Sequence, residues 1–187
     1  MISIFVNNEE REYAIQHRIV PPHKAVTVYN GVDHFSIKVY LQENYRRQAR
    51  QNWNIKADSM VIGFVGRLWE QKDPQTLYET IKACQNLPVK FVILGDGPYR
   101  HLFEDKSLNV FLNGWVDKPL HYYAGLDILI QPSLWEGLSM TIIEAMSFGK
   151  PIIASNIKGN RECVVHGKNG FLCEPRNSAS FRQAIET

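Results

Sequence analysis

Two carboxylates flank the start of a segment with helical spacing, and their positions suit the binding of a phosphorylated sugar. Glu136 lies in a loop after the apolar run 127–131, and Glu144 lies within the helical pattern of residues 140–148. The first N–H groups of a helix lack intrahelical acceptors and carry the positive end of the helix dipole, so they bind anions. Gly137 would let a ligand approach the backbone, and Glu144 could accept both hydrogens of a ribose diol. On spacing alone, a solvated Glu136 and a Glu144 that only supports the helix dipole are equally good interpretations.

Two cations form a second candidate site. Arg67 and Lys72 stand in a loop that follows the apolar run 61–65. An arginine can bind phosphate oxygens through two parallel N–H groups, and a lysine supplies a compact point charge, so the pair suits a diphosphate. Taken alone, an arginine and a lysine at such a place are more often solvated surface charges.

Both candidate sites depend on elements that alternate along the chain. Apolar runs typical of strands lie at 61–65, 89–94, 110–113, 127–131, 151–154 and 171–173. Segments with helical spacing separate several of these runs, which predicts an α/β fold with a doubly wound, Rossmann-like parallel sheet. Ligands bind such sheets at the carboxyl ends of the strands, and the loops with Arg67, Lys72 and Glu136 all lie at that edge.

The segment before these strands contains two more strand-like runs and two helices. Residues 2–6 and 24–29 are strand-like, and Asn7 or Asn8 can cap a helix between them. A helix at 41–52 carries three arginines, namely Arg46, Arg47 and Arg50. We favour a solvated helix face for these arginines over a basic patch for a lipid or an acidic acceptor.

Composition excludes several classes of protein. The chain has 187 residues, 44% of them hydrophobic and 21% charged, as in an ordinary soluble domain. A net charge of +2 is too small to argue for nucleic acid as a partner. Three cysteines, Cys84, Cys163 and Cys173, have no metal-ligand spacing and are expected to be reduced thiols of a cytoplasmic protein. No signal peptide and no apolar run of membrane-spanning length are present.

Two motifs carry a resemblance to a known family. Residues 136–155, EGLSMTIIEAMSFGKPIIAS, resemble the donor-binding signature of GT-B glycosyltransferases, specifically the family-4-like retaining group, also called glycosyl transferases group 1. Residues 66–73, GRLWEQKD, resemble the GRL-x-x-QK loop of the same family, whose Arg and Lys neutralise the leaving nucleotide diphosphate. Residues 159–162, GNRE, resemble the family's GG-x-x-E turn, with Asn160 in place of the second glycine.

The resemblance implies a hexosyltransferase that uses a nucleotide-diphosphate sugar with retention, in the synthesis of a glycan or surface polysaccharide. It assigns catalytic roles to Arg67, Lys72 and Glu136, because charge on the leaving phosphate must be stabilised in the transition state. It assigns donor binding to Gly66, Val116, Gly137, Leu138, Ser139 and Glu144. Trp115 is expected either to stack on the base or, at least as readily, to pack in the core. No metal and no other cofactor are expected, since two cations are present and no DxD pattern is found.

The resemblance also implies a domain organisation and a set of partners. Residues 1–20 are expected to be the tail of an otherwise absent N-terminal acceptor domain, and residues 21–187 to be the donor-binding domain, truncated at its C-terminus. The expected partners are the nucleotide-sugar donor, a glycan or lipid-linked acceptor, and the absent domain. A lipid-linked acceptor would bring the full-length protein to the inner face of the membrane. We expect the isolated chain to bind nucleotide and to transfer sugar poorly or not at all.

Two other functions stay open. One is a nucleotide-binding module without catalysis, against which the intact set of Arg67, Lys72, Glu136 and Glu144 argues. The other is a different GT-B-like enzyme, such as a nucleotide-sugar epimerase or a phosphorylase. The sequence names neither the base, nor the donor sugar, nor the acceptor.

Overall fold

A six-stranded parallel sheet forms the centre of the molecule. The computed structural model describes residues 1–187 apart from the side chain of His34. The strand order is β5-β4-β3-β6-β7-β8, and each neighbouring pair is parallel. The strands are β3 (Met60–Val65), β4 (Val89–Leu94), β5 (Val110–Gly114), β6 (Ile128–Gln131), β7 (Ile152–Ser155) and β8 (Gly170–Cys173). The α/β class and the parallel sheet are therefore confirmed, and each expected strand is present.

The order of the strands fixes where a ligand would bind. From β3 the chain moves outward through β4 to β5, and it then returns to place β6 on the other side of β3. Ile62 of β3 pairs with Ile128 of β6 in this central position. A doubly wound sheet has a crevice at such a reversal, outside the carboxyl ends of the two strands. The loops that follow β3 and β6 are those that carry Arg67, Lys72 and Glu136.

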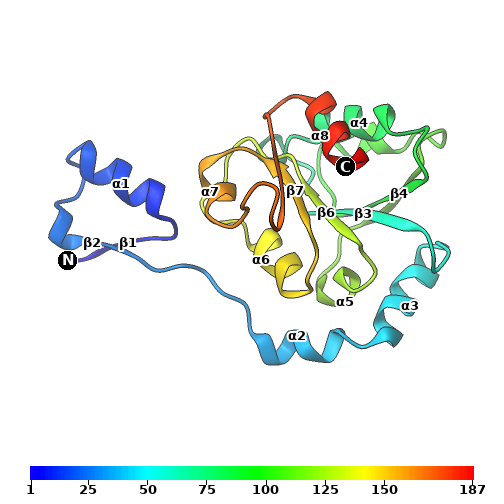
Figure 1. Cartoon of the computed structure of the whole chain (residues 1–187), viewed down its shortest axis with the longest axis horizontal. Coiled ribbons are helices and arrows are strands. Elements are labelled where there is room, and N and C mark those ends of the chain that lie inside the picture. Colours follow the sequence, from blue (N-terminus) through cyan, green and yellow to red (C-terminus); the bar gives the residue numbers. More distant parts are fainter.

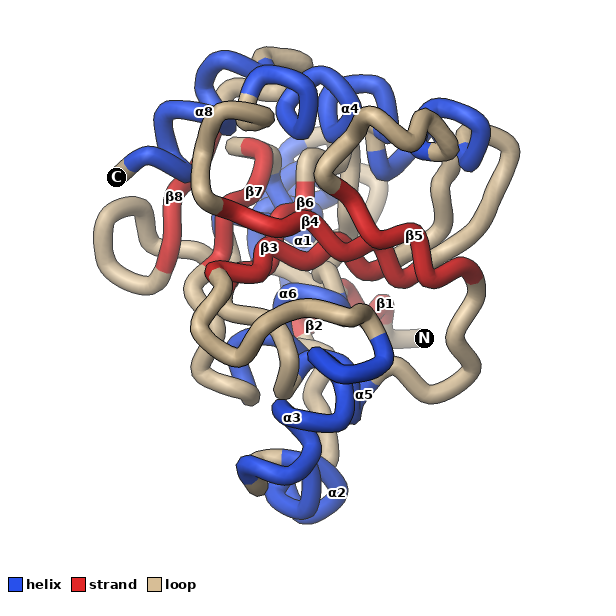
Figure 2. The backbone as a smooth tube through the Cα atoms, turned by 90° about the vertical axis from the view of Figure 1, so that its right-hand side faces the viewer, coloured by secondary structure: helices blue, strands red, loops and turns tan.

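Helices cover both faces of the sheet (Figures 1 and 2). One face packs against α3 (Glu43–Asn52), α5 (Leu120–Tyr123) and α6 (Met140–Ser147), and the other against α4 (Pro74–Ala83) and α8 (Ser178–Glu186). Alternate residues of one strand contribute to opposite cores, as with Val61 and Ile62 of β3. This explains the continuous apolar runs, because a strand of a covered parallel sheet is buried on both sides.

The first residues form a separate small unit, seen apart from the main sheet in Figure 1. In this unit β1 (Ser3–Phe5) and β2 (Ala25–Thr27) pair in parallel, with α1 (Asn8–Gln16) between them along the chain. The change from one sheet to the other therefore comes after Thr27, whereas the sequence analysis placed the domain boundary at residue 20. An extended stretch then leads to α2 (His34–Tyr40), a helix that the sequence analysis did not predict.

The interpretation of the α3 arginines as a solvated face is wrong for two of the three. Arg50 is only 2% exposed, and its guanidinium donates to the carbonyls of Gly125, Ala57 and Ser59 and to Asp127 Oδ2. Arg46 donates to the other oxygen of Asp127 at 2.7 Å. These arginines attach α3 to the residues just before β6, which explains why Arg50 is buried and Arg46 is partly buried.

The remaining helix, α7 (Lys158–Arg161), follows β7 and ends next to the N-terminal unit. None of the helices in the described part of the chain has both the length and the apolar character that a membrane span requires.

Candidate functional site

The two loops that the sequence analysis singled out lie side by side. The backbone N–H of Leu134, after β6, donates to the carbonyl of Gln71, after β3, at 2.8 Å. The side chain of Gln71 donates to the carbonyl of Trp135 at 3.0 Å. The reversal of strand order thus brings together residues that are far apart in the sequence.

Lys72 and Glu136 form an ion pair across these loops. Lys72 Nζ lies 2.5 Å from Glu136 Oε1, and the two side chains are only 15% and 8% exposed. The same carboxylate oxygen accepts from Ser133 Oγ at 2.8 Å and from Gln131 Nε2 at 3.2 Å. Glu136 is therefore rigidly held, and the charge of Lys72 is compensated within the protein. The sequence analysis expected each residue to face the donor separately and did not foresee the pair.

Arg67 is the cation that the protein does not compensate. Its side chain is exposed, and its guanidinium carbon lies 4.7 Å from the centre of the Trp69 ring. Within the described residues it takes part in no ion pair. Gly66 precedes it with a φ of 151°, a conformation that side chains disfavour, so glycine suits this turn. Arg67 is thus available to an anion, whereas Lys72 is engaged.

The start of α6 offers unsatisfied hydrogen-bond donors. Ser139 occupies the N-cap position, as expected, but its side chain makes no capping bond. Its Oγ atom is buried without a hydrogen-bond partner among the described residues. The N–H groups of Gly137, Leu138 and Ser139 likewise donate to no atom that the structure describes. Since buried donors normally have acceptors, these groups indicate a site for an anionic ligand or for ordered water.

The loop before α6 is held close to α7. A Cβ atom on Gly159 would lie 2.4 Å from the carbonyl oxygens of Glu136 and Gly137. Real Cβ atoms do not approach backbone oxygens so closely, which explains a glycine at this position. The backbone of residues 136–137 is therefore positioned by contact with α7.

Glu144 is bound to a buried tyrosine. Tyr123 donates its hydroxyl to Glu144 Oε2 at 2.7 Å. Burial and the negative charge of Glu144 raise the pKa of Tyr123 well above its usual value, so the phenol stays a donor. The bond fixes one carboxylate oxygen, and the other has no partner among the described residues. Val116 packs partly buried against the same core as Tyr123. The ribose role of Glu144 and the base role of Val116 stay predictions.

Trp115 does not pack in the core. It lies in the loop after β5 and is 75% exposed. The expected alternative of a core position is therefore wrong, and stacking on the base stays a prediction.

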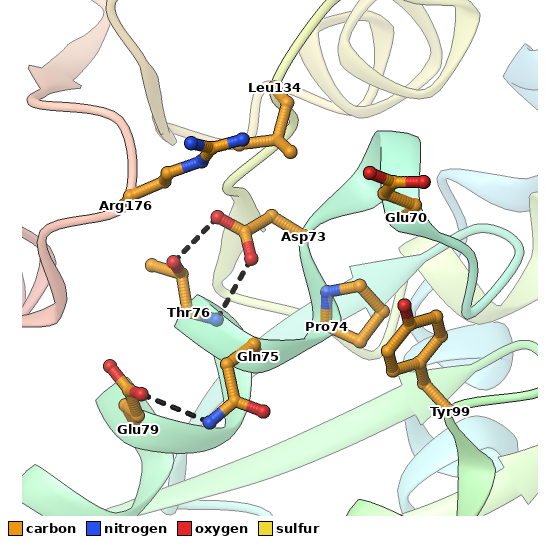
Figure 3. Close-up of a pocket in the computed structure, with 9 residues that line it drawn as sticks. All are labelled: Glu70, Asp73, Pro74, Gln75, Thr76, Glu79, Tyr99, Leu134 and Arg176. Carbon is orange, nitrogen blue, oxygen red and sulfur yellow. Dashed lines mark hydrogen bonds between the residues drawn. The ribbon is translucent and has the colours of Figure 1, made fainter.

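A separate cavity of about 310 Å³ lies next to the loop that follows β3 (Figure 3). Its walls are formed by Glu70, Asp73, Pro74, Gln75, Thr76, Glu79, Tyr99, Leu134 and Arg176. Asp73 caps α4 there, as expected, because its two oxygens accept from the backbone N–H and the hydroxyl of Thr76. Neither Arg67, Lys72 nor Glu136 lines this cavity, so it is distinct from the candidate site.

Sequence reasoning missed several residues that support the site. Gln71, Gln131 and Ser133 all donate to Glu136, and Tyr123 donates to Glu144. One signal was available for Gln131, which is a polar residue at the end of an otherwise apolar strand. Among the described residues no group of three or more metal-ligating side chains is found. Independence from metals stays a prediction.

Comparison with known proteins places these residues in a family. Residues 59–187 match the family described as Glycosyl transferases group 1. The UDP-Gal:alpha-D-GlcNAc-diphosphoundecaprenol alpha-1,3-galactosyltransferase of Escherichia coli is 33% identical over 97% of this chain and 49% of its own length. The capsular polysaccharide biosynthesis glycosyltransferase CapM of Staphylococcus aureus is 28% identical over 78% of this chain and 39% of its own length. The chain thus spans about half the length of these curated relatives.

Solved structures have the same fold. A glycosyltransferase from Rickettsia africae ESF-5 matches with a TM-score of 0.88 at 20% identity, over 99% of this chain and 52% of that one. Anabaena HepE, solved in complex with UDP and glucose, matches with a TM-score of 0.83 at 24% identity, over 99% and 52%. Together with the family match over residues 59–187, these likenesses establish that the chain belongs to the group 1 glycosyl transferases and forms the C-terminal half of their GT-B fold.

Proposed function

We propose that this chain is the donor-binding half of a retaining hexosyltransferase, which moves a sugar from a nucleotide-diphosphate sugar to an acceptor without a metal ion. The observation that carries the proposal is an uncompensated Arg67 at the same sheet edge as the unsatisfied donors of residues 137–139. Both a positive charge and the free N–H groups at the start of a helix favour the binding of a diphosphate.

The chemistry follows from charge development. When the glycosidic bond of a donor breaks, negative charge grows on the leaving phosphate. Arg67 and the N–H groups at the start of α6 would stabilise that charge more strongly in the transition state than in the ground state. These cationic and N–H groups take the role that a divalent metal has in other transferases, which is why we propose metal independence.

Lys72 and Glu136 are proposed to act after a rearrangement of their ion pair. A bound diphosphate competes with Glu136 for the ammonium group of Lys72. The Glu136 Oε2 atom, whose described contact is a 3.4 Å bond from Gln71, then faces a hydroxyl or the anomeric centre of the donor sugar. The fixed position of this carboxylate favours such a role, since positioned groups lose little freedom on binding.

The nucleoside is proposed to lie on the α5–α6 side of the crevice. Glu144, with one oxygen held by Tyr123, offers its other oxygen to a ribose hydroxyl. Backbone groups near Val116 would bind the base edge, and the exposed ring of Trp115 lies in the same loop and could stack on the base.

We further propose a UDP-sugar as donor and a glycan or lipid-linked acceptor, in the assembly of a surface polysaccharide. The E. coli relative is named for UDP-Gal and for a diphosphoundecaprenol acceptor, and CapM for capsule synthesis. A lipid-linked acceptor implies work at the inner face of the cytoplasmic membrane.

The acceptor is proposed to bind on a domain that continues the small β1–β2 sheet. Ile4 and Val26 pair across this sheet and are both exposed, so one of its faces is apolar and uncovered. The relatives are about twice as long as this chain, which leaves room for a domain that covers this face. Transfer by this chain alone is therefore expected to be weak or absent.

Calorimetric titration with UDP, GDP and ADP, with and without EDTA, tests the proposal. We expect UDP to bind, insensitively to EDTA, and Arg67→Ala to weaken binding about tenfold or more, as for loss of a charged hydrogen bond. Arg47→Ala is the matched control, since Arg47 is an exposed arginine on α3. Binding that requires a metal, or that ignores Arg67, would overturn the diphosphate site. Release of free UDP from a UDP-sugar would separate transfer or hydrolysis from epimerisation.

A further inference from the structure

Asn7 connects the N-terminal unit to the loop that precedes α6. It is completely buried, and both ends of its side-chain amide are used. Its Oδ1 atom accepts from the N–H of Glu10 at 2.7 Å and so caps α1. Its Nδ2 atom donates to the carbonyl of Gly137 at 2.6 Å. The second bond crosses from one unit to the other and is unnecessary for capping the helix.

This second bond fixes the direction of a peptide group in the candidate donor site. A peptide bond is planar and trans, so its C=O and N–H point in opposite directions. The carbonyl of Gly137 and the N–H of Leu138 belong to one such group. While Asn7 holds the carbonyl on the α1 side, the N–H of Leu138 points away from α1, and it has no acceptor among the described residues.

Further contacts hold α1 in the position from which Asn7 reaches Gly137. Glu162 Oε1 accepts from the N–H groups of Asn8 and Glu9, at 2.8 and 3.2 Å. Arg161 binds both oxygens of Glu9, at 2.9 and 2.8 Å. The Asn7 bond is therefore part of a polar interface between α1 and the end of α7, so a shift of the N-terminal unit would release Gly137.

We propose that Asn7 is a positioning residue of the donor site. It orients the Gly137–Leu138 peptide for the sugar-linked phosphate of the donor, which is the terminal phosphate of UDP, and it couples that orientation to the placement of residues 1–27. The inference rests on the proposed function, since it assumes that a nucleotide diphosphate binds at the start of α6. It goes beyond that function by assigning a role in donor binding to a residue outside the six-stranded domain.

Two substitutions separate the two bonds of Asn7. Asn7→Asp and Asn7→Ser both keep an oxygen that can cap α1. An ionised aspartate has no donor for Gly137, and the shorter serine side chain lacks the Nδ2 group that reaches this carbonyl. Asn177 provides the matched control, because it caps α8 in the same way, through a bond from Ser180 N to its Oδ1 at 3.1 Å. The corresponding Asn177 variants change an N-cap asparagine that does not bond to the loop before α6. Each variant is titrated with UDP and with UMP, and its thermal unfolding is recorded.

The comparison of UDP with UMP gives the decisive result. We expect both Asn7 variants to bind UDP about tenfold more weakly, because ordering the freed peptide then opposes binding. Their affinity for UMP, which lacks the terminal phosphate, should stay within about twofold. The Asn177 variants should bind both nucleotides as the unsubstituted chain does.

Other results would overturn the inference. Unchanged UDP binding would mean that the Gly137 bond does not position the peptide. Equal weakening for UDP and UMP, or unfolding of both Asn7 variants, would assign Asn7 a structural role only. If the unsubstituted chain bound UDP no more tightly than UMP, the proposed function would fail first, and the inference with it.

Discussion

The ammonium group of Lys72 lies 2.5 Å from the Glu136 carboxylate, so two residues expected to act on the donor neutralise each other in the structure. Both side chains are largely buried, and Ser133 and Gln131 hold the same carboxylate oxygen. A diphosphate that approaches this point meets one compensated cation, Lys72, and one uncompensated cation, Arg67. The proposed use of both cations by the donor therefore requires Lys72 to divide its N–H groups between Glu136 and the phosphate.

The first prediction concerns Glu136→Gln. Removing the carboxylate frees Lys72 and removes a negative charge that repels phosphate, so we expect UDP to bind about fivefold more tightly, a gain of about 1 kcal/mol. Calorimetry with UDP measures the change. Glu70→Gln is the control, since Glu70 is an exposed carboxylate of the same loop that lines the separate cavity. Weaker binding in Glu136→Gln would instead mean that Glu136 holds Lys72 in place for the phosphate.

A second prediction concerns the aromatic ring under Arg67. The guanidinium lies 4.7 Å from the Trp69 ring centre, which limits the positions of an exposed side chain. Such contacts contribute about 0.5–1 kcal/mol at exposed sites, so Trp69→Leu should weaken UDP binding about threefold. Trp69→Phe keeps an aromatic face and should recover most of the affinity. If Trp69→Leu and Trp69→Phe both bound UDP as tightly as the unsubstituted chain does, the ring would have no part in placing Arg67.

The fold was predictable because its strands are buried on both faces. Residues 61–65, 91–94, 128–130 and 152–154 of these strands are apolar without interruption, and such runs separated by helices leave few alternatives to a parallel sheet. The motif residues at the strand ends were predictable for the same reason, since the carboxyl ends of parallel strands share one edge. The pairing of β2 with β1 was not predictable, because an alternating strand carries no information on which sheet it joins.

The sequence could not predict which groups these side chains would contact. The charged pattern of α3 predicts that Arg50 lies on the surface. Only the fold brings the carbonyls of residues 57, 59 and 125 around its guanidinium. The Lys72–Glu136 pair joins two loops that meet only after the sheet has formed. The position of Asn7 predicts a helix cap, but only the fold shows that its side chain also reaches Gly137 in the loop before α6.

A third prediction tests the contact between α7 and the loop before α6. In Gly159→Ala the new Cβ would meet the carbonyl oxygens of Glu136 and Gly137 at 2.4 Å, and backbone atoms cannot easily move aside. We expect a loss of about 1–3 kcal/mol in the free energy of unfolding, together with weaker UDP binding because residues 136–137 are displaced. Gly31→Ala is the control, since a Cβ there would meet nothing within 4 Å. Thermal unfolding and calorimetry measure both effects, and an unchanged Gly159→Ala would contradict the close packing of this loop.

The last prediction concerns Asp127, which binds Arg50, Arg46 and the N–H of Val61. Burial tends to raise the pKa of this carboxyl, but hydrogen bonds from Arg46 and Val61 and the charges of the arginines outweigh burial, so the pKa is lower than usual. A carboxyl whose pKa is lower in the folded state stabilises the protein above its unfolded pKa, which is about 3.9. That stability is lost as the pH falls from about 4 through the folded pKa.

Asp127→Asn should therefore lower the free energy of unfolding by about 3 kcal/mol at pH 7, because buried Arg50 loses its counter-charge. The difference from the unsubstituted chain should shrink as the pH falls below about 4, where Asp127 itself becomes protonated. Urea unfolding at pH 7, 5, 4 and 3 measures this difference, with Asp58→Asn as a control at an exposed carboxylate. A difference that stays constant over this range would mean that shape and hydrogen bonding, and not the charge of Asp127, hold α3 against the sheet.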